Sequence, residues 1–386
     1  QCFSYMLRYY FYTFIHCLGT IELNMNIGVN ARHLIENKLE GLGWYSYEIL
    51  KRIVDIHKEH KFYFFYDRNT KPLVISENVI NVFVKPPARH PFLFNIWFNY
   101  SLTSRFKKYN IHIFFSPDGF LSLRTQIKQI GVIHDLNFEH YPKDLPKGVL
   151  KYYKTKMPLF AHKASKIVTV SEFSRNDICQ KYAVDIQKVK VVYNGGNESF
   201  NPLSIEERSK FKKANNNGRS YFIYVGSLHK RKNIERMLKA FKLFNTKKEM
   251  DFVIVGENMW QNQLNLKGLL EDVIFLGRKS GEELSKWVAS SAAMVYVSYF
   301  EGFGLPVLEG MMAGVPVVTS SETSIPEVGG DAVIYTDPFS IESIRDGLFE
   351  AVKDSNFEYY REKGTDRAKF FSWDKSATEI SNLLTK

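Results

Sequence analysis

Two carboxylates lie eight positions apart in the segment Glu301–Glu309 (EGFGLPVLE), on either side of a glycine-rich turn. Gly302 and Gly304 let the backbone turn tightly and expose its N–H groups, and a helix that begins near Leu305 directs its positive end at an anion such as phosphate. The carboxylates can then accept hydrogen bonds from sugar and ribose hydroxyls. The pattern indicates a nucleotide-sugar site; the alternative is an ordinary strand, turn and helix that carry two unrelated acids.

A second segment, Tyr224–Asn233 (YVGSLHKRKN), joins a strand end, a turn at Gly226 and three consecutive basic residues. A basic side chain just before a helix N-terminus can stabilise the negative charge that grows on a leaving diphosphate, and Lys232 or Arg231 has that position. Asn233 is expected to be the N-cap of the helix that follows. The apolar face of that helix consists of Ile234, Met237, Leu238, Phe241 and Phe244. A solvated basic surface is the alternative interpretation.

Two further apolar runs end in glycine, at Gly256 and Gly277. In an open parallel sheet the carboxyl ends of the strands line the ligand crevice, so both glycines are expected there. A nucleobase would then lie near Gly277 and Arg278. A glycine after a strand is also the ordinary start of a turn, which is the alternative here.

The chain must supply elements that hold these residues, and its composition allows it. Its 386 residues are 45% hydrophobic and 24% charged, which excludes a disordered or fibrous protein and favours two globular domains. The three cysteines, Cys2, Cys17 and Cys179, are too far apart for a zinc or redox motif. A reducing cytoplasm is therefore the expected compartment.

The positive charge is concentrated in the first half of the chain. Residues 1–200 contain 27 Lys and Arg against 16 Asp and Glu, whereas residues 201–386 contain 25 of each. Such a field attracts phosphates on a membrane, on an acceptor or on nucleic acid. Because no nucleic-acid-binding module accompanies the charge, an anionic membrane surface or a phosphorylated acceptor is favoured.

Two basic segments are the expected membrane contacts. One is Phe92–Tyr109, with Trp97, Phe98, Arg105, Lys107 and Lys108, and the other is Lys143–Lys166, with seven lysines. The alternative is that both form amphipathic helices, which bury their apolar face and leave the lysines in solvent.

From Met25 onward, short β-branched or aromatic runs alternate with amphipathic stretches, which is typical of parallel α/β layers. The strands expected in the first half are Ile27–Asn30, Phe62–Tyr66, Ile111–Ser116, Ile130–His134, Lys166–Val170 and Val189–Tyr193. Those expected in the second half are Tyr221–Val225, Asp251–Val255, Val273–Leu276, Ala293–Val297, Val315–Thr319 and Ala332–Tyr335.

These runs predict two doubly wound domains, residues 25–200 and 201–372. The polar stretch 201–220 is expected to be a helical spacer and loop between them. Residues 1–24 are aromatic but interrupted by Arg8 and His16, so they make a poor membrane span or signal peptide. They are expected to lie outside the native fold, with an interfacial anchor helix as the alternative.

Together the motifs resemble the retaining nucleotide-sugar glycosyltransferases of the GT4 group, from Met25 to the C-terminus. Glu301–Glu309 matches the E-x7-E motif of that family, and Val225–Asn233 matches its first donor-domain loop. Further matches are Val132–Asp135 (VIHD), Thr169–Ser174 (TVSEFS), Val192–Gly195 (VYNG) and Ser324–Val328 (SIPEV). The resemblance implies the GT-B fold, in which two Rossmann-like domains face each other across a cleft. It also implies a C-terminal helix, here residues 373–386, that crosses back to the first domain.

The resemblance also implies roles for single residues on the donor side. Glu301 would contact the donor sugar, Glu309 the ribose hydroxyls, and the backbone of Phe303, Gly304 and Leu305 the sugar and phosphate. Lys232 would hold the diphosphate with support from Arg231. Many relatives carry Arg where this chain has Ser227, so the positive charge of this loop comes from residues Lys230–Lys232 alone.

On the opposite side of the cleft, the resemblance assigns Gly41 and Gly43 to the glycine loop beneath the donor phosphates. It also implies that His134 faces the reacting sugar. The local alternative for His134 is a turn histidine held by the backbone.

The implied reaction transfers a hexose with retained configuration, and the leaving phosphate helps to deprotonate the acceptor hydroxyl. No cofactor is expected, and the absence of any Asp-x-Asp pair in the sequence predicts a metal-independent site. The motifs look most like the mannosyltransferase branch, which suggests GDP-mannose, with UDP-glucose and UDP-N-acetylhexosamine left open.

The expected acceptor is a saccharide or lipid-linked saccharide of polysaccharide or lipopolysaccharide type. The expected location is the cytoplasm, with peripheral contact to the inner leaflet of the cell membrane. Two alternatives of other classes are a nucleotide-sugar epimerase of the same architecture and a basic nucleic-acid-binding protein.

Overall fold

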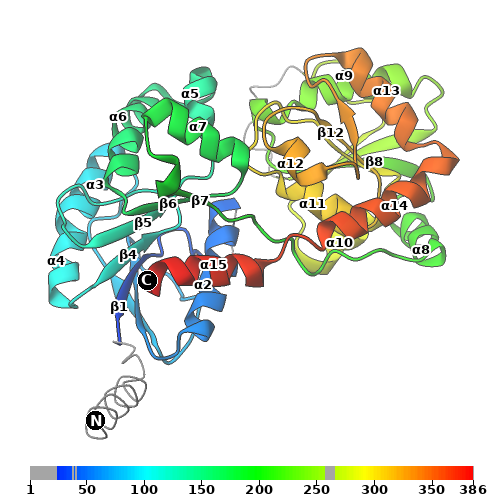
Figure 1. The fold of residues 1–386 in the computed structure, drawn as a ribbon. Coiled ribbons are helices and arrows are strands. Elements are labelled where there is room, and N and C mark those ends of the chain that lie inside the picture. Colours follow the sequence, from blue (N-terminus) through cyan, green and yellow to red (C-terminus); the bar gives the residue numbers. More distant parts are fainter. Residues whose placement is uncertain (1–23, 37–38, 40, 257–265, 386) are drawn as a thin grey trace, which may run out of the picture.

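Two all-parallel β-sheets organise the computed structural model, which describes residues 24–36, 39, 41–256 and 266–385 (Figure 1). The strands of the first sheet are β1 (Asn26–Asn30), β2 (Lys61–Tyr66), β3 (Val79–Phe83), β4 (Ile113–Ser116), β5 (Lys128–Val132), β6 (Lys166–Thr169) and β7 (Val189–Val191). Those of the second are β8 (Ser220–Val225), β9 (Met250–Val255), β10 (Val273–Gly277), β11 (Ala293–Tyr296), β12 (Val317–Ser320) and β13 (Ile334–Thr336). The expectation for residues 1–24 falls outside the described residues, except for Asn24.

The strand orders are β3-β2-β1-β4-β5-β6-β7 and β10-β9-β8-β11-β12-β13. From β1 the chain first adds strands on one side of the sheet (β2, β3) and then on the other (β4 to β7), so the order of strands reverses between β1 and β4. In the second sheet the same reversal lies between β8 and β11. Both domains are therefore doubly wound α/β units, as the sequence predicts, and ligands of such sheets bind at the carboxyl ends near the reversal.

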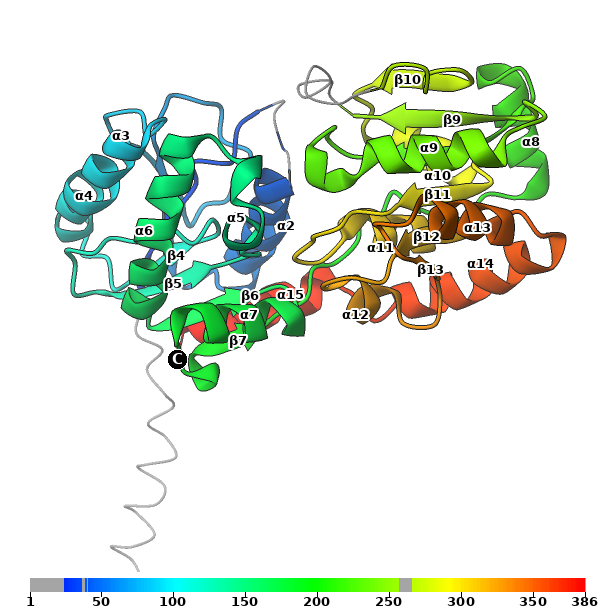
Figure 2. The same cartoon turned by 90° about the horizontal axis from the view of Figure 1, so that it is seen from above.

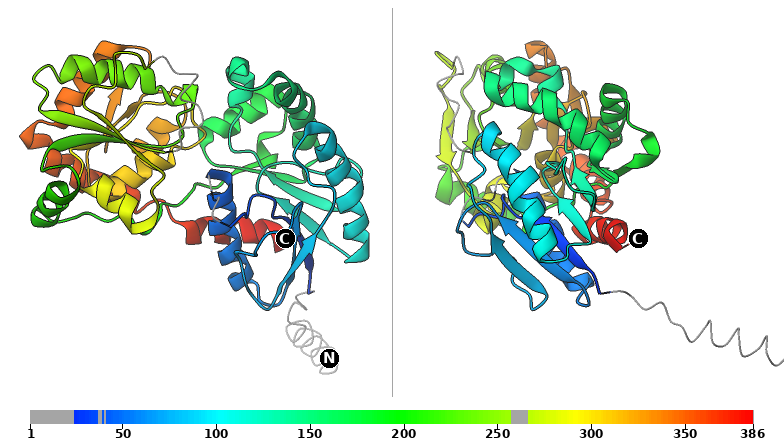
Figure 3. Two further views of the ribbon diagram at one scale, coloured as in Figure 1. Left: turned by 180° about the vertical axis from the view of Figure 1, so that it is seen from behind. Right: turned by 90° about the vertical axis from the view of Figure 1, so that its left-hand side faces the viewer.

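Helices connect the strands and cover the sheets (Figures 1 and 3). Those of the first domain are α2 (Gly41–Ile56), α3 (Pro91–Ile96), α4 (Leu102–Lys108), α5 (Asn137–His140), α6 (Lys147–Lys163) and α7 (Glu172–Tyr182). Those that follow are α8 (Ile205–Asn215), α9 (Ile234–Phe244), α10 (Gly281–Ala289), α11 (Leu305–Met312), α12 (Ile325–Gly329), α13 (Ile341–Ala351), α14 (Asp354–Ala368) and α15 (Trp373–Thr385).

Strand β2 shows why the apolar runs form central strands. Phe62 and Phe64 pack with Ile49 and Ile53 of α2 on one face of the sheet. Phe65, which points to the other face, packs with Phe106 of α4. Since side chains alternate along a strand and both faces are covered by helices, every position of such a strand must be apolar.

All twelve predicted strands are present, with ends shifted by a few residues, but strand β3 was missed. β3 lies at the edge of the first sheet, beside β2. Only Val82 among its residues is buried, so the strand lacks the continuous apolar pattern by which the others were recognised. An edge strand can afford polar and exposed positions that a central strand cannot.

The helix expected within residues 201–220 is present as α8, but it packs against the second domain, which corrects the expectation of a spacer between the domains. The ring of Phe211 in α8 packs edge-on against Trp287 of α10, with centroids 5.2 Å apart. Arg208 donates to the carbonyl of Ser291 at 2.8 Å. The polar appearance of α8 conceals these contacts because few of its side chains take part.

The C-terminal helix α15 returns to the first domain and lies along α2 (Figures 1 and 2). Arg52 of α2 donates to the carboxylate of Asp374 at 2.5 Å, and the rings of Tyr45 and Trp373 lie 5.9 Å apart. A Cβ at Gly195 would approach the backbone nitrogen of Trp373 to 2.3 Å. Glycine at this position thus allows the chain to cross back closely.

The aromatic residues of 92–109 are mostly core residues, so the expected membrane contact by Trp97 and Phe98 is wrong. Their side chains are 0% and 1% exposed and pack with the first sheet. Only Phe92 and Tyr100 of this segment are exposed large apolar side chains, at 73% and 53%. Within the described part of the chain, no helix has the length and apolarity needed to cross a membrane.

Candidate active site

A cavity of about 540 Å³ lies between the carboxyl ends of the two sheets. That size is typical of small-molecule sites, which usually enclose roughly 300–1,000 Å³. The lining residues of the first domain include Leu39, Gly41, Leu42, Trp44, Tyr45, His134, Asp135, Val170 and Asn194. Those of the second domain include Gly226, Arg231, Lys232, Gly256, Arg278, Lys279, Tyr296, Glu301, Phe303, Gly304, Leu305 and Glu309.

A buried charge cluster forms the floor of the second-domain side. One carboxylate oxygen of Glu301, Oε1, accepts hydrogen bonds from Lys232 Nζ at 2.5 Å and from the hydroxyl of Tyr296 at 2.9 Å. The other oxygen, Oε2, forms an ion pair with Arg231 at 2.8 Å. Lys232 also donates to the Tyr296 hydroxyl. Two cations therefore surround one carboxylate, which leaves the cluster one net positive charge.

The pKa values in this cluster follow from its burial and composition. Burial alone would raise the pKa of Glu301, but Arg231 and Lys232 hold it at about 2. Burial, with the nearby Arg231, lowers the pKa of Lys232 to about 8, although Glu301 opposes that shift. Glu301 is consequently a charged hydrogen-bond acceptor and too weak a base to take a proton during a reaction.

The glycine-rich turn needs its glycines for two different reasons. Gly304 has φ +101°, a left-handed conformation, and a Cβ there would lie 2.5 Å from the side chain of Ile325. A Cβ at Gly302 would lie 2.3 Å from the carbonyl oxygen of His134, in the other domain. The helix α11 then begins at Leu305, as predicted, and its N-terminal residues face the cavity.

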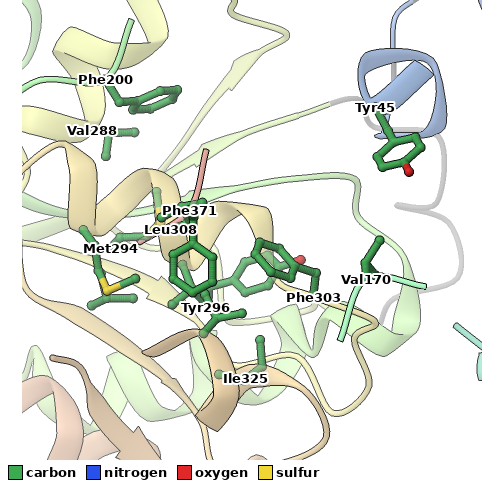
Figure 4. Close-up of a cluster of buried hydrophobic side chains, with 14 of the residues drawn as sticks. Tyr45, Val170, Phe200, Val288, Met294, Tyr296, Phe303, Leu308, Ile325 and Phe371 are labelled. Carbon is green, nitrogen blue, oxygen red and sulfur yellow. The ribbon is translucent and has the colours of Figure 1, made fainter. Parts of the chain in front are cut away.

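The side chain of Phe303 packs away from the backbone that lines the cavity. Its ring lies 5.5 Å from that of Phe371, and Figure 4 shows both gathered near Leu308 of α11. The residues from Phe303 to Leu305 therefore line the cavity mainly with backbone atoms, together with the positive N-terminal end of α11.

Glu309, one turn into α11, differs from Glu301 in having no partner. Within the described residues, no hydrogen bond or ion pair involves its half-buried carboxylate. Burial raises the pKa of Glu309 to about 8. The site thus holds one carboxylate that is permanently charged and one that needs a ligand's hydrogen bonds to stabilise its charge.

His134 combines the two interpretations offered by the sequence. Its Nε2 lies 2.9 Å from the carbonyl oxygen of Pro117, which can only accept, so Nε2 carries the proton. Burial lowers the pKa of His134, which keeps the ring neutral and leaves Nδ1 as an acceptor. The ring also packs edge-on against Tyr45, 4.6 Å between centroids, and lines the cavity.

Comparison with known proteins agrees with this architecture. The model of glycosyl transferases group 1 matches residues 205–368, and that of glycosyltransferase family 4 matches residues 39–200. O-antigen chain mannosyltransferase B of Escherichia coli is 30% identical over 288 residues, which cover 72% of this chain and 74% of that protein. The chain is a glycosyltransferase of this family.

Solved structures show the same fold at low sequence identity. Sucrose-phosphate synthase from Thermosynechococcus elongatus has a TM-score of 0.77 at 15% identity, and covers 94% of the transferase and 98% of its own chain. Anabaena HepE in complex with UDP-glucose has a TM-score of 0.72 at 16% identity, with 94% and 99% covered. The transferase accordingly has the GT-B fold that the resemblance implied.

Two predicted site glycines do not line the cavity of the transferase. A Cβ at Gly43 would lie 2.7 Å from the carbonyl oxygen of His33, so this glycine permits close packing behind the first turn of α2. Gly277 accepts the backbone N–H of Gly256 at 2.9 Å and supports that residue from behind. The other predicted site residues all face the cavity.

Asn233 occupies the predicted N-cap position of α9 but does not cap the helix with its side chain. It has a left-handed backbone, φ 63°, and its Nδ2 donates to the carbonyls of Val297 and Pro338 at 3.0 and 2.7 Å. The residue therefore ties the loop after β8 to the loop after β11, which brings Lys232 to Glu301.

Several residues of the site escaped individual prediction. Asn194 and Asp135 lie within motifs that carried the resemblance, so that signal was present for both. Tyr45 and Tyr296 had no such signal, because a tyrosine in an apolar run looks like a core residue. The one described cluster with metal-ligand spacing, His57, Glu59 and His60, lies at the amino end of β2, away from the cavity.

Contacts between the domains surround the site. Glu327 of α12 accepts hydrogen bonds from the backbone N–H of Glu172 at 2.7 Å and of Phe173 at 3.3 Å, at the start of α7 in the first domain. It also accepts from the hydroxyl of Tyr193 at 2.7 Å. Ser174 lies between the carbonyls of His134 and Gly302, at 3.1 and 3.5 Å. The carboxylate of Glu327 thus caps a helix of the opposite domain.

We expect Gly302→Ala to hold the domains of the transferase apart, because its Cβ would collide with the carbonyl of His134. The variant should transfer sugar at least tenfold more slowly and show a larger radius of gyration in small-angle scattering. Gly148→Ala is the matched control, since nothing lies within 4 Å of a Cβ there. Unchanged activity and radius in Gly302→Ala would contradict a closing contact.

We expect Glu309→Gln to stabilise the unliganded transferase at alkaline pH. Between the usual carboxyl pKa of 4.5 and the folded value of about 8, the unfolded chain is ionised at Glu309 while the folded one is not. Stability is therefore lost as pH rises through this window. The variant should gain about 2 kcal/mol at pH 8, less than the full shift because Glu309 is half-buried.

Urea unfolding at pH 4.5 and pH 8 measures this effect, with the exposed Glu77→Gln as control. The stability difference between Glu309→Gln and the wild type should be near zero at pH 4.5. A variant that is equally or less stable than the wild type at pH 8 would show that Glu309 is not strained in the free site.

Proposed function

We propose that this transferase moves mannose from GDP-mannose to a hydroxyl of a saccharide or lipid-linked saccharide, with retained anomeric configuration. The observation that carries the proposal is the net-positive cluster of Glu301, Arg231 and Lys232, which lies beside the N-terminus of α11 and opposite His134. Mannose is supported by the similarity to O-antigen chain mannosyltransferase B. A UDP-sugar is the second donor class, since HepE was solved with UDP-glucose.

Stabilisation of the leaving diphosphate is the role we propose for the two cations. Arg231 stays charged, because Glu301 raises its pKa against the effect of burial. Lys232 has a pKa near 8, so an incoming diphosphate would also favour its charged form. Together with the backbone N–H groups at the start of α11, these cations would act without reorganisation as the phosphate departs.

The two carboxylates have separable roles in this proposal. Glu301 is fixed and charged, so it would accept hydrogen bonds from hydroxyls of the donor sugar and take no proton. Glu309 would accept from the two ribose hydroxyls, which supply the partners that it lacks in the free site. Neutral His134 would offer Nδ1 to a hydroxyl of the reacting sugar.

A retaining, metal-independent and cofactor-free reaction fits these side chains. Retention through attack on the face that the phosphate leaves needs no nucleophilic carboxylate, and Glu301 is too strongly paired to be one. The cations provide the charge stabilisation that a metal ion would otherwise supply. The leaving phosphate would accept the proton of the acceptor hydroxyl.

Thermal unfolding with GDP-mannose, UDP-glucose and UDP-N-acetylglucosamine tests the donor. GDP-mannose should stabilise the wild type most, by about 2.7 kcal/mol at 100 times its dissociation constant. Glu309→Gln should lose most of this stabilisation. Glu301→Gln should still bind, but transfer mannose at least a hundredfold more slowly.

Two outcomes would overturn the proposal. Stabilisation by nucleic acid and by no sugar nucleotide would indicate a binding protein, and release of a rearranged sugar nucleotide without acceptor would indicate an epimerase. The anomeric proton of the product, observed by NMR, checks retention. An unchanged rate in excess EDTA checks metal independence.

We further propose that the enzyme works in the cytoplasm, on the inner leaflet of the cell membrane. Exposed Phe92, Tyr100 and Leu159 lie in the two lysine-rich segments of the basic first domain. At low salt, at least five times more protein should sediment with phosphatidylglycerol vesicles than with phosphatidylcholine vesicles. High salt should abolish the difference, and equal binding to both at low salt would contradict the proposal.

A further inference from the structure

A second buried charge cluster lies in the first domain, beyond the carboxyl ends of β1 and β4. Its centre is the carboxylate of Asp118, which is 1% exposed. Five groups donate to it: Asn30 Nδ2 at 2.8 Å, Ser116 Oγ at 2.9 Å and the N–H of Phe120 at 3.1 Å on Oδ1, and Arg32 Nη2 at 2.6 Å and His33 Nε2 at 3.1 Å on Oδ2.

Arg32 is held rigidly beside this carboxylate. Its guanidinium lies within van der Waals reach of four aromatic rings, with its central carbon 4.9–5.5 Å from their centroids. These rings belong to Phe94, Trp97, Phe98 and Phe120. A charged pair in such a place costs desolvation energy, and an apolar pair of similar volume often serves stability as well. The cluster is therefore poorly explained by stability alone.

His33 is the one member of the ion-paired set that reaches solvent. Its side chain is 39% exposed, against 6% for Arg32 and 1% for Asp118. Asp118 does not need it, because four other donors already satisfy both carboxylate oxygens. The hydrogen bond instead fixes the ring of His33. Since the Asp118 carboxylate can only accept, Nε2 donates, and Nδ1 is the ring nitrogen of His33 left to bind a ligand.

The cluster lies next to the cavity of the active site. The carbonyl of His33 packs under the first turn of α2, where Gly41 and Leu42 line the cavity. Pro117, directly before Asp118, accepts the hydrogen bond that orients His134. One short loop therefore holds both histidines, since Pro117 accepts from His134, which lines the cavity, and Asp118 accepts from His33, which is partly exposed.

We infer that His33 binds the acceptor: its Nδ1 accepts a hydrogen bond from a hydroxyl of the acceptor saccharide, and Asp118 with Arg32 are positioning residues. In the proposed function the cluster around Glu301, in the second domain, binds the donor. The acceptor must therefore approach from the first domain, where His33 lies. This inference rests on the proposed function, because it assigns the second substrate of that reaction.

The test compares His33→Phe, His33→Asn and the wild type with GDP-mannose as donor and octyl α-mannoside as acceptor probe. His33→Phe should raise the dissociation constant of octyl α-mannoside, measured by NMR line broadening, and its KM at least tenfold. Hydrolysis of GDP-mannose and thermal stabilisation by it should stay within twofold of the wild type. His33→Asn should recover part of the affinity, since its amide oxygen can accept near the position of Nδ1.

His162→Phe is the control, because His162 is exposed at the end of α6, just before the amino end of β6, whereas the cavity lies at the carboxyl ends of the strands. Equal affinity of His33→Phe and the wild type for octyl α-mannoside would overturn the inference. So would a loss of donor binding as large as that of acceptor binding, which would make His33 structural. A wild type that neither binds nor hydrolyses any sugar nucleotide would instead refute the proposed function.

Discussion

The carboxylate of Glu301, held between Arg231 and Lys232, is the constraint on which the donor side of the cleft depends. None of these three charges is easily buried alone, because removal of one partner leaves an uncompensated charge in a poorly solvated place. Glu301 keeps Lys232 largely charged, and the two cations keep Glu301 ionised. The neighbouring strands β8 and β11 must therefore end side by side, because Arg231 and Lys232 lie on the loop after β8 and Glu301 lies on the loop after β11.

Further contacts between the loops hold these charged residues in place. Asn233 bridges the two loops with its amide, and Arg231 also donates to the carbonyl of Phe300 at 2.9 Å. Gly226 and Gly256 approach each other so closely that a Cβ at Gly256 would lie 1.9 Å from the carbonyl oxygen of Gly226. The close glycine contact and the left-handed backbone of Asn233 thus serve the position of charged atoms, and rare conformations of this kind are common at functional sites.

The sequence predicted the sheets better than the contacts between distant residues. Runs such as Phe62–Tyr66 predict a central strand, because both faces of such a strand are buried and must be apolar. The edge strand Val79–Phe83 has only one buried residue and no comparable pattern. Glu301 and Glu309 were found because their spacing surrounds a recognisable turn. The different ionisation of these two carboxylates, and the link from Asp118 to His33, arise from tertiary contacts that no local spacing records.

The carboxylate of Glu327 has a consequence for the way the two domains communicate. It supplies the acceptors for the first N–H groups of α7, while Ser171 of that helix supplies another for Ser174. Separation of the domains therefore leaves a helix end unsatisfied, at a cost of about 1 kcal/mol for a lost cap. Opening of the cleft therefore also favours fraying of the first turn of α7. The amides of Glu172 and Phe173 lose their acceptor whenever the cleft opens, so the state of these two hydrogen bonds reflects how often it is open.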